Sequence, residues 1–422
     1  MKLSKHKLGE LIEVTRGASL SGQFYAEEGE LIRLTLGNFN MNGGGFKENT
    51  SKTDLYYTGT VKDEFILNKG DIITPLTEQS LGLLGTTARI PENGKYIQSQ
   101  DVALVKCKEG LLDPNFCYYL ISSSIVRQQL SAGAQQTKIR HTSPDKIKDC
   151  TVWVPEFEEQ KRIGRILTDI DEKITLNRQI NDNLEAMAKQ LYDYWFVQFD
   201  FPNEEGKPYK SSGGAMVWNE KLKREIPQGW GTQNLADCLK LKTERVNSKD
   251  IKDTDNYTPI EVIPRKQMSL HETVALENAM SGICRYSRRN ILLSNRRVYF
   301  HKVCIAPFDG LTRDTVLVLE PYNSGNLGYL YETVFADEFI LFATKHSYGS
   351  EQPVLSWTAA QKFNVLRPSY SIDKKYSEIV GSIIESVLNN QIEIIKLTKQ
   401  RDELLPLLMN GQATVNYHLS AY

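Results

Sequence analysis

The residues best suited to chemistry are basic side chains interleaved with aromatic ones near position 290. No acidic residue occurs between Glu277 and Asp309. Arginine can chelate a guanine edge or grip a phosphate, and aromatic side chains can stack on bases. The segment favours nucleic-acid binding, and the alternative is a solvated basic surface. Its candidate residues are Arg285, Arg288, Arg289, Arg296, Arg297, Tyr299, His301 and Lys302, followed by Arg313.

A second acid-free stretch lies in the first half of the chain, from Pro114 to Pro144. Glutamine amides can read adenine edges, and basic side chains can hold phosphates. Two such stretches in one chain favour two DNA-reading units over a single basic patch. The candidates here are Gln135, Gln136, Lys138, Arg140 and His141.

Catalytic constellations are missing from the sequence. It contains no phosphate-binding loop, no H-E-x-x-H pair, no serine nucleophile elbow and no adenine-methylase signature. The run Pro144-Asp145-Lys146 has part of a nuclease motif but lacks a well-spaced second carboxylate for a metal ion. We therefore predict no catalytic residues and no metal site, which favours a binding or scaffolding protein over a self-contained nuclease or methylase.

Composition limits the class of protein. The chain has 422 residues, 40% of them hydrophobic and 24% charged, which is enough for two or three folded domains. No apolar run reaches the roughly 20 residues needed to span a bilayer. The 6 cysteines are scattered without a C-x-x-C pair, as expected of reduced thiols in a cytoplasmic protein. The net charge of −1 conceals an acidic excess at residues 156–210, where 8 basic and 12 acidic side chains occur.

Two long helices must position these segments. Between Pro155 and Pro202 there is no proline, and apolar residues recur in interleaved seven-residue lines, which predicts a helix that pairs with another. The pattern returns from Ser371 to Asn410, displaced by 213 residues. The matching seam positions are Ile170, Asn177, Leu184 and Leu191 in the first helix and Ile383, Asn390, Leu397 and Leu404 in the second.

The shared displacement indicates an internal duplication, in which each globular half is followed by a helix. Weaker echoes in the globular halves keep nearly the same offset, such as DVALV at 101–105 and DTVLV at 314–318. Antiparallel packing of the helices would relate the halves by a pseudo-twofold axis. Asn177 and Asn390 would fix the register of the seam, unless both lie on its solvated edge. Arg401 stands where the first helix has Ala188, so it marks either a seam edge or a snorkelling side chain.

Specific stretches of the chain resemble the specificity subunit of a Type I restriction–modification system. The connector PYKSSGGAMVWNEKLKREIPQGW at 208–230 and the helix start EFEEQKRIGRIL at 156–167 are typical of that family. The segment ILLSNRRVYFHKVCIAPFDG at 291–310 resembles a recurrent type of target-recognition domain. The resemblance extends over the whole chain, and residues 1–150 match least distinctively.

The resemblance implies an α+β fold in which two mixed α/β target-recognition domains are joined by two long antiparallel coiled-coil helices. It implies a non-catalytic subunit that reads a bipartite target in double-stranded DNA, with the helices as a spacer. Two methylation subunits, and in some systems two motor-nuclease subunits, would dock on it. Cofactors would sit on these partners, with S-adenosylmethionine on the first and ATP and Mg²⁺ on the second, and the complex would be an adenine-N6 methyltransferase and ATP-dependent endonuclease.

Domain bounds follow from these parts. We expect target-recognition domains at 1–155 and 231–368, helices at 156–200 and 369–412, a connector at 201–230 and a tail at 413–422. In the first domain the resemblance adds Arg89, Gln98 and Gln100 to the candidate DNA contacts. Subunit docking is expected on exposed faces of 156–196 and 371–410. Trp195, Phe196 and Phe199 either belong to that docking surface or pack against the adjoining recognition domain.

One alternative of a different class is a coiled-coil adaptor whose globular halves bind protein. That interpretation requires no duplicated basic segments and predicts no salt-sensitive DNA binding, whereas phosphate contacts predict such sensitivity.

Overall fold

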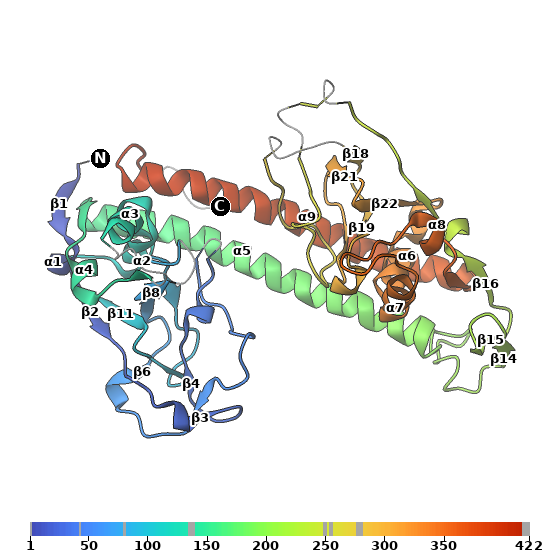
Figure 1. The fold of residues 1–422 in the computed structure, drawn as a ribbon, viewed down its shortest axis with the longest axis horizontal. Helices are drawn as coiled ribbons and strands as arrows, with labels where there is room; N and C mark the ends of the chain where they lie inside the picture. The colour runs from blue at the N-terminus through green and yellow to red at the C-terminus, as the bar shows by residue number, and fades with distance from the viewer. Residues whose placement is uncertain are drawn as a thin grey trace. The chain divides into compact units, whose positions relative to one another are not determined.

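A computed structural model describes residues 2–41, 44–78, 82–133, 140–247, 251–252, 256–275 and 282–415. The chain forms two compact units (Figure 1). Unit 1 contains Met1–Glu172 and Leu397–Tyr422, and unit 2 contains Lys173–Lys396. Helices α5 (Phe157–Tyr192) and α9 (Tyr370–Met409) each contribute residues to both units. Side chains of both helices therefore belong to the hydrophobic cores of the two units.

Unit 1 is built on a four-stranded antiparallel sheet in the order β2-β11-β7-β9. Small sheets β1-β13, β12-β8 and β3-β5-β4-β10-β6 accompany it. The strands are β1 (Ser4–Lys7), β2 (Ile12–Arg16), β3 (Tyr25–Ala26), β4 (Ile32–Arg33), β5 (Tyr56–Tyr57), β6 (Ile66–Leu67), β7 (Ile72–Pro75), β8 (Thr77–Glu78), β9 (Ala88–Arg89), β10 (Tyr96–Ile97), β11 (Val102–Cys107), β12 (Arg140–His141) and β13 (Thr151–Val154). The helices are α1 (Leu8–Leu11), α2 (Pro114–Ser122), α3 (Ser124–Ala132), α4 (Pro144–Lys148) and the start of α5.

Unit 2 repeats this plan with a sheet in the order β17-β22-β19-β20, accompanied by β16-β23, β18-β21 and the hairpin β14-β15. The strands are β14 (Met216–Asn219), β15 (Arg224–Pro227), β16 (Gly231–Asn234), β17 (Leu239–Leu241), β18 (Ile283–Tyr286), β19 (Ile291–Ser294), β20 (Val303–Ile305), β21 (Gly310–Arg313), β22 (Val316–Pro321) and β23 (Asn364–Arg367). Its helices are α6 (Leu327–Phe335), α7 (Asp337–Lys345) and α8 (Trp357–Ala360), besides parts of α5 and α9.

The two main sheets have the same topology. In each, the first strand along the chain pairs with the fourth, the fourth with the second and the second with the third. Each begins after a strand that pairs with the last strand of its own unit, β1 with β13 and β16 with β23. The main sheets of the two units therefore share one strand order.

Both faces of each sheet are covered, because successive side chains of a strand point to opposite faces. On β19, Ile291 and Leu293 join the cluster that contains α6 and α9 side chains, whereas Leu292 joins a cluster on the other face. On β11, Ala103 and Val105 face the α2 side of the sheet, and Leu104 joins the other cluster. Two buried faces explain the near-continuous apolar runs of these strands.

Helices α5 and α9 bury the predicted seven-residue lines. The companion lines, Leu167, Ile174, Asn181, Ala188 and Trp195 on one helix segment and Val380, Val387, Ile394, Arg401 and Leu408 on the other, are buried throughout. Among the seam positions named above, Asn177 and Ile383 are buried, and Ile170, Leu184, Leu191, Asn390, Leu397 and Leu404 are partly buried.

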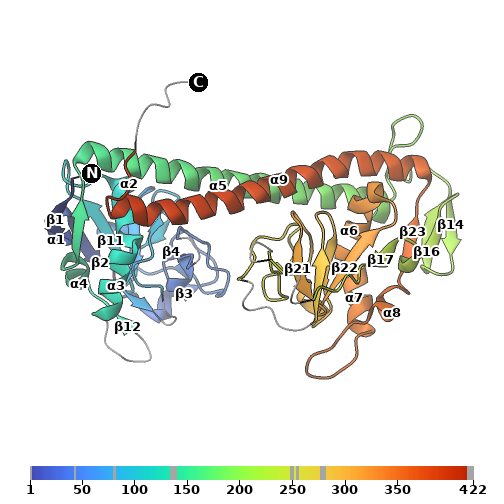
Figure 2. The ribbon, with the colours of Figure 1, turned by 90° about the horizontal axis from the view of Figure 1, so that it is seen from above.

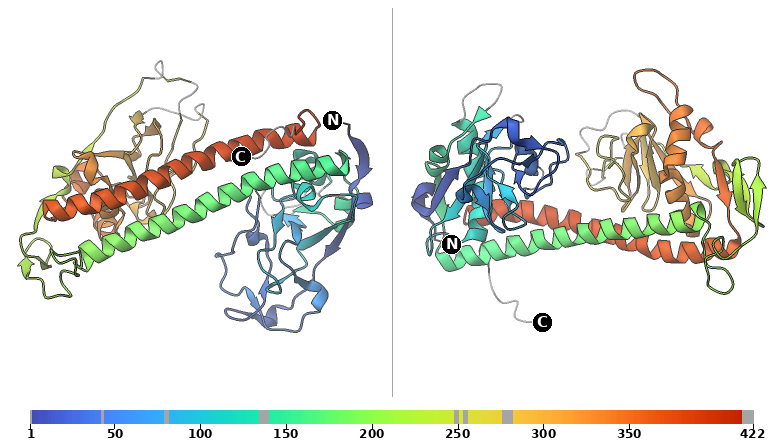
Figure 3. Two further views of the ribbon diagram at one scale, coloured as in Figure 1. Left: turned by 180° about the vertical axis from the view of Figure 1, so that it is seen from behind. Right: turned by 90° about the horizontal axis from the view of Figure 1, so that it is seen from below.

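Polar contacts define how the helices meet. In unit 2, where they lie side by side (Figure 2), the Asn390 amide donates to Asn181 Oδ1 at 2.9 Å and the Asn177 amide donates to Glu393 Oε2 at 2.9 Å. Residue numbers rise on α5 as they fall on α9, so the helices are antiparallel in this unit. The two helices also lie side by side in unit 1 (Figure 3). There Arg401 Nη1 lies 2.8 Å from Asp171 Oδ1. Arg401 is therefore a buried, ion-paired residue, neither a seam edge nor a snorkelling side chain, and Asn177 does not lie on a solvated edge.

The aromatic residues after α5 pack inside unit 2. The helix continues as a π-helical turn, Asp193–Val197, and Trp195, Phe196 and Phe199 are all buried. The Phe196 ring lies 4.8 Å from that of Tyr376, and the Phe199 ring lies 5.9 Å from that of Trp230. Of the two roles expected for these three residues, packing against the recognition domain is the one that the structure supports.

Candidate nucleic-acid interface

The acid-free segment of unit 2 is not free of acids in space. Arg288 Nη2 lies 2.6 Å from Glu385 Oε2, and Arg289 Nη1 lies 2.8 Å from Glu385 Oε1. Arg288 also donates to the Pro307 carbonyl. Glu385 is on α9, so these two arginines attach the β18–β19 turn to the long helix. They were predicted to contact DNA, and this stays a prediction for two guanidinium groups that share a carboxylate partner within unit 2.

Two other residues predicted to contact DNA also have hydrogen-bond partners inside unit 2. Lys302 Nζ donates to the carbonyls of Ile260 at 2.6 Å and Glu261 at 3.0 Å, and burial lowers the pKa of Lys302. His301 is buried with Nε2 at 2.6 Å from the Phe335 carbonyl, and burial lowers the pKa of its imidazole. Both side chains hold loops together, and their contact with DNA stays a prediction.

Arg285 and Arg313 come from the paired strands β18 and β21. Arg285 Nε lies 3.6 Å from Glu244 Oε1. Arg313 is half-buried opposite Ile283, and its Nε atom is buried without a hydrogen-bond partner. A buried guanidinium nitrogen without a partner is costly, so Arg313 has unused donor capacity.

The exposed candidates of unit 2 lie together after strand β19. Arg296 and Tyr299 are exposed, and Arg297 is half-buried with its backbone N donating to the Pro353 carbonyl at 2.9 Å. Arg297 has a left-handed backbone, with φ 47°, which starts the turn Val298–Phe300. Of the nine basic and aromatic candidates in this unit, Arg296 and Tyr299 present the most accessible side chains.

In unit 1 the structure also divides the candidates. Gln98 is buried, and its amide donates to the carbonyls of Thr15 at 2.8 Å and Val102 at 3.0 Å, so it is a structural residue. Arg89 donates to Asn115 Oδ1 at 2.6 Å and lies over the Tyr118 ring. Gln100 accepts a hydrogen bond from Ser19 at 3.1 Å.

The remaining unit 1 candidates belong to the stretch that ends in strand β12. Gln135, Gln136 and Lys138 lie outside the described residues. Arg140 donates to Ser131 Oγ at 3.0 Å and lies 3.6 Å from Glu78 Oε1. His141 is exposed. Arg140 and His141 therefore remain candidates for DNA contact.

Tyr348 is a candidate that the sequence analysis did not name. It is 65% exposed and forms a backbone bridge with Val354, which in turn bridges Arg296. A signal was present in the sequence, because SYGSEQ at 347–352 echoes SAGAQQ at 131–136, the stretch that supplied Gln135 and Gln136.

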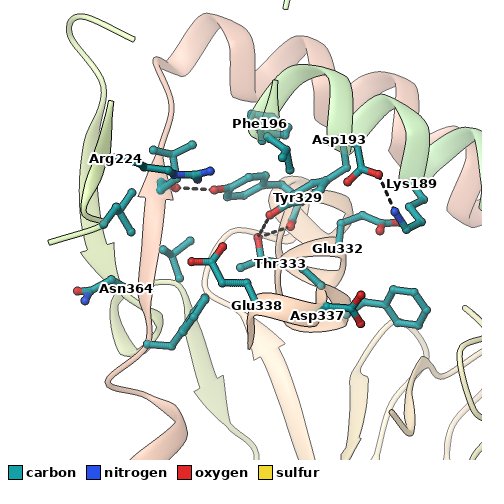
Figure 4. Close-up of a pocket in the computed structure, with 18 of the residues that line it drawn as sticks. Lys189, Asp193, Phe196, Arg224, Tyr329, Glu332, Thr333, Asp337, Glu338 and Asn364 are labelled. Carbon is teal, nitrogen blue, oxygen red and sulfur yellow. Dashed lines mark hydrogen bonds and ion pairs between the residues drawn. The ribbon is translucent and has the colours of Figure 1, made fainter. Parts of the chain in front are cut away.

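A cavity of about 440 Å³ lies elsewhere in unit 2 (Figure 4). Lys189 and Asp193 reach it from the end of α5, and Glu332, Thr333 and Glu338 reach it from α6 and α7. Burial raises the pKa of Glu332 to about 8, while Lys189 nearby lowers it. Across the described part of the chain, no group of three or more His, Cys, Asp and Glu side chains is arranged to hold a metal ion.

Comparisons with known proteins agree with the predicted family. Residues 2–186 match the model of the Type I restriction modification DNA specificity domain. The Type I restriction enzyme MjaIX specificity subunit of Methanocaldococcus jannaschii is 24% identical over 331 residues, which cover 73% of this chain and 71% of the relative. The Type I restriction enzyme HindI specificity subunit of Haemophilus influenzae is 24% identical over 393 residues, covering 76% and 84% respectively.

A solved structure shares the fold. The Type-I restriction-modification system S subunit from M. genitalium aligns with a TM-score of 0.58 at 17% identity, covering 97% of this chain and 96% of that one. None of the helices in the described ranges is long and apolar enough to span a membrane. The resemblance predicted from the residues is thus confirmed, and this chain, with a specificity domain at residues 2–186, is related over most of its length to the specificity subunits of Type I restriction–modification systems.

Proposed function

We propose that this chain is the DNA-specificity subunit of a Type I restriction–modification enzyme and reads a bipartite target in double-stranded DNA. The observation that carries the proposal is the repeated sheet topology of the two units, together with the relatedness to specificity subunits. Two units with one plan suit two half-sites, and their different side chains suit two different sequences.

The long helices would act as the spacer between the half-sites. Their buried seven-residue lines and their antiparallel contacts in unit 2 support an antiparallel coiled coil, with the units related by a pseudo-twofold axis. Asparagines in an apolar seam favour one register over others. This register would keep the number of unread base pairs constant.

Partner subunits would dock on helix α5. A stripe of large apolar side chains, with Ile180, Met187 and Tyr194 spaced by seven residues and Leu176 beside them, is 38–56% exposed. The stripe lies on a different helix face from the buried line that meets α9. Exposed apolar stripes of this kind mark helix-binding surfaces. We infer that methylation subunits bind here, with motor-nuclease subunits joining them in a complete restriction complex.

The chemistry would reside on these partners. Methylation subunits would bind S-adenosylmethionine and methylate adenine at N6, and motor-nuclease subunits would use ATP and Mg²⁺. This chain would determine which DNA sequence is recognised and how many base pairs separate its two halves. The two carboxylates with strongly raised pKa values in unit 2, Glu185 and Glu332, would have a structural rather than a catalytic role.

The test is single-molecule methylome sequencing of cells that carry this chain and its methylation partner, compared with cells that carry the partner alone. We expect a split motif with a fixed gap, methylated on adenine only when this chain is present. Unchanged adenine methylation, with the partner shown to be expressed and active, would favour the protein-binding adaptor. Electrophoretic shifts of the purified complex at increasing salt would separate the two interpretations independently, because phosphate contacts weaken as salt rises.

A further inference from the structure

Both units contain a short two-stranded ribbon immediately after the same strand of the main sheet. In unit 1 the ribbon is formed by β8 and β12, with Thr77 opposite His141 and Glu78 opposite Arg140. In unit 2 it is formed by residues 295–297 and 353–355, with Arg296 opposite Val354. The name reading ribbon is used below for residues 76–78 with 140–142 and for residues 295–297 with 353–355.

One backbone hydrogen bond stands at the equivalent place in the two reading ribbons. In unit 1 the Thr142 amide donates to the Leu76 carbonyl at 2.8 Å, and in unit 2 the Leu355 amide donates to the Asn295 carbonyl at 2.8 Å. The next residue is in each case a serine that caps a short helix, Ser143 before α4 and Ser356 before α8. These matches make Thr77 equivalent to Arg296, and His141 equivalent to Val354.

The ribbon of unit 2 gathers exposed side chains on one face. Tyr348 and Val354 exchange both backbone hydrogen bonds, at 3.0 and 2.8 Å, and Val354 faces Arg296 on its other side. Residues directly opposite one another in antiparallel pairs point to the same face, about 5 Å apart. Arg296 and Tyr348 therefore flank Val354 on one face, and both are exposed.

A buried carboxylate, that of Glu78, holds the ribbon of unit 1 in place. Glu78 Oε2 accepts hydrogen bonds from the backbone N–H groups of Gly82, Leu83 and Leu84 at 3.0–3.1 Å. Glu78 is 3% exposed, and Arg140 lies 3.6 Å from its other oxygen. Hydrogen bonds to a charged acceptor are about twice as strong as neutral ones, so Glu78 fixes the ribbon firmly to residues 82–84. His141 remains exposed at the position that Val354 occupies in unit 2.

We propose that the reading ribbon is the base-reading element of each unit. Arg296 and Tyr348 contact one half-site, and His141 with Arg140 contacts the other, while Glu78 is a positioning residue. A two-stranded ribbon fits the major groove, where arginine donates to guanine and an exposed ring can contact a thymine methyl group or stack. The backbone plan is common to both units, and the side chains differ at equivalent positions, so each ribbon reads a different sequence. The proposal rests on the proposed function.

The experiment is methylome sequencing of cells that carry the methylation partner and either wild type or a variant of this chain. The ribbon variants are Arg296→Ala, Tyr348→Ala and His141→Ala, and the first control is Tyr322→Ala. Tyr322 is also 65% exposed, but it follows the far end of β22, about 20 Å along the strand from the ribbon. The Arg367→Ala variant, on β23, is a matched control for the loss of an exposed arginine.

We expect Arg296→Ala and Tyr348→Ala either to reduce methylation of the wild-type motif at least tenfold or to broaden the base preference in one half-site only. The His141→Ala variant should change the other half only, and the two controls should change neither. One lost base contact of 1–3 kcal/mol corresponds to roughly 5- to 150-fold in affinity. Unfolding temperatures equal to wild type would show that these surface variants are folded.

Two failures can be told apart. If wild type supports no split motif, the proposed function is wrong. If wild type supports a split motif and the ribbon variants leave it unchanged, or alter both halves alike, the proposal of a reading ribbon is wrong. The positioning role of Glu78 is tested by its variants, because Glu78→Gln should preserve the half-site read with His141 better than Glu78→Ala, with the other half unchanged in both.

Discussion

At the residue scale, Arg401 shows how a charge enters an apolar seam. Its side chain is 9% exposed, and it contacts Asp171 on α5 and Asp402 on its own helix. The Tyr119 hydroxyl donates to the second oxygen of Asp171 at 2.7 Å. The carboxylate of Asp171 is thereby bonded on both oxygens, which offsets part of the cost of burying two charges.

Removing one partner of the pair between Asp171 and Arg401 should lower the free energy of unfolding more than replacing both charged residues. We expect Asp171→Ala to lower the free energy of unfolding by about 1.5–3 kcal/mol, because the buried Arg401 guanidinium loses its charge-paired hydrogen bond to Asp171 and keeps Asp402. The double variant Asp171→Leu with Arg401→Leu should recover most of that loss. Denaturant unfolding followed by circular dichroism measures both effects. A single variant as stable as the double would contradict the argument.

Glu332 makes unit 2 sensitive to pH. Its pKa is raised from 4.5 to about 8 by burial, against the opposing charge of Lys189, and the carboxylates of Asp193 and Glu185 raise it further. The folded chain therefore holds a proton between pH 4.5 and 8 that the unfolded chain has released. The free energy of unfolding must fall as pH rises through this range and level off above pH 8.

The Glu332→Gln variant should lose this dependence. We expect its unfolding temperature to exceed that of wild type by an amount that grows from pH 5 to pH 8, reaching on the order of 5 °C at pH 9. Glu185, whose pKa burial raises to about 7, should leave a smaller residual slope in the variant. Scanning calorimetry from pH 5 to pH 9 measures the difference, and a difference independent of pH would contradict the assignment.

At the element scale, α5 has two apolar faces with different partners. One is buried against α9, and the other carries Ile180 and Met187, with Tyr194 continuing it in the π-helical turn. We expect Met187→Glu to reduce co-purification of the methylation subunit at least tenfold without lowering the unfolding temperature, because a charge would enter the apolar interface. The Gln179→Glu variant places the same charge on an exposed position of a neighbouring face and should leave binding intact. Equal binding by both variants would show that the methylation subunit docks on a different surface.

The elements themselves were largely predictable from the sequence. The seven-residue lines predicted helices at 156–200 and 369–412, and the structure has them at Phe157–Tyr192 and Tyr370–Met409. These predictions succeed because periodicity is local, and long regular patterns admit few alternatives.

The availability of individual side chains was less predictable. Arg288 and Glu385 are 97 residues apart, so an acid-free window in the sequence says nothing about the acid that α9 brings to it. Gln98 is a polar residue next to a strand, so its position in the sequence suggests an exposed side chain. In the structure its buried amide donates hydrogen bonds to two backbone carbonyls. Such partners depend on tertiary packing. Only the structure therefore shows that Arg296 and His141 are exposed while several of their basic neighbours are bonded within the protein.

At the scale of the whole molecule, the proposed spacer makes a quantitative prediction. Helix α5 begins in unit 1 and ends in unit 2, and α9 runs between them in the other order along the chain. Deleting one heptad from each helix, at facing positions around the contact between Asn181 and Asn390, keeps both apolar lines in phase. At 1.5 Å per residue the deletion shortens the spacer by about 10 Å, which equals about 3 base pairs.

We expect the shortened chain to direct methylation to the same two half-sites with a gap smaller by about 3 base pairs, as measured by methylome sequencing. A deletion of four residues from each helix is the matched control, because it shifts the seam out of phase and should abolish methylation altogether. The half-sites are read by side chains outside the deleted segments, so their sequences should stay as in wild type. A full-heptad variant that remains active with the original gap would show that something other than α5 and α9 sets the spacing.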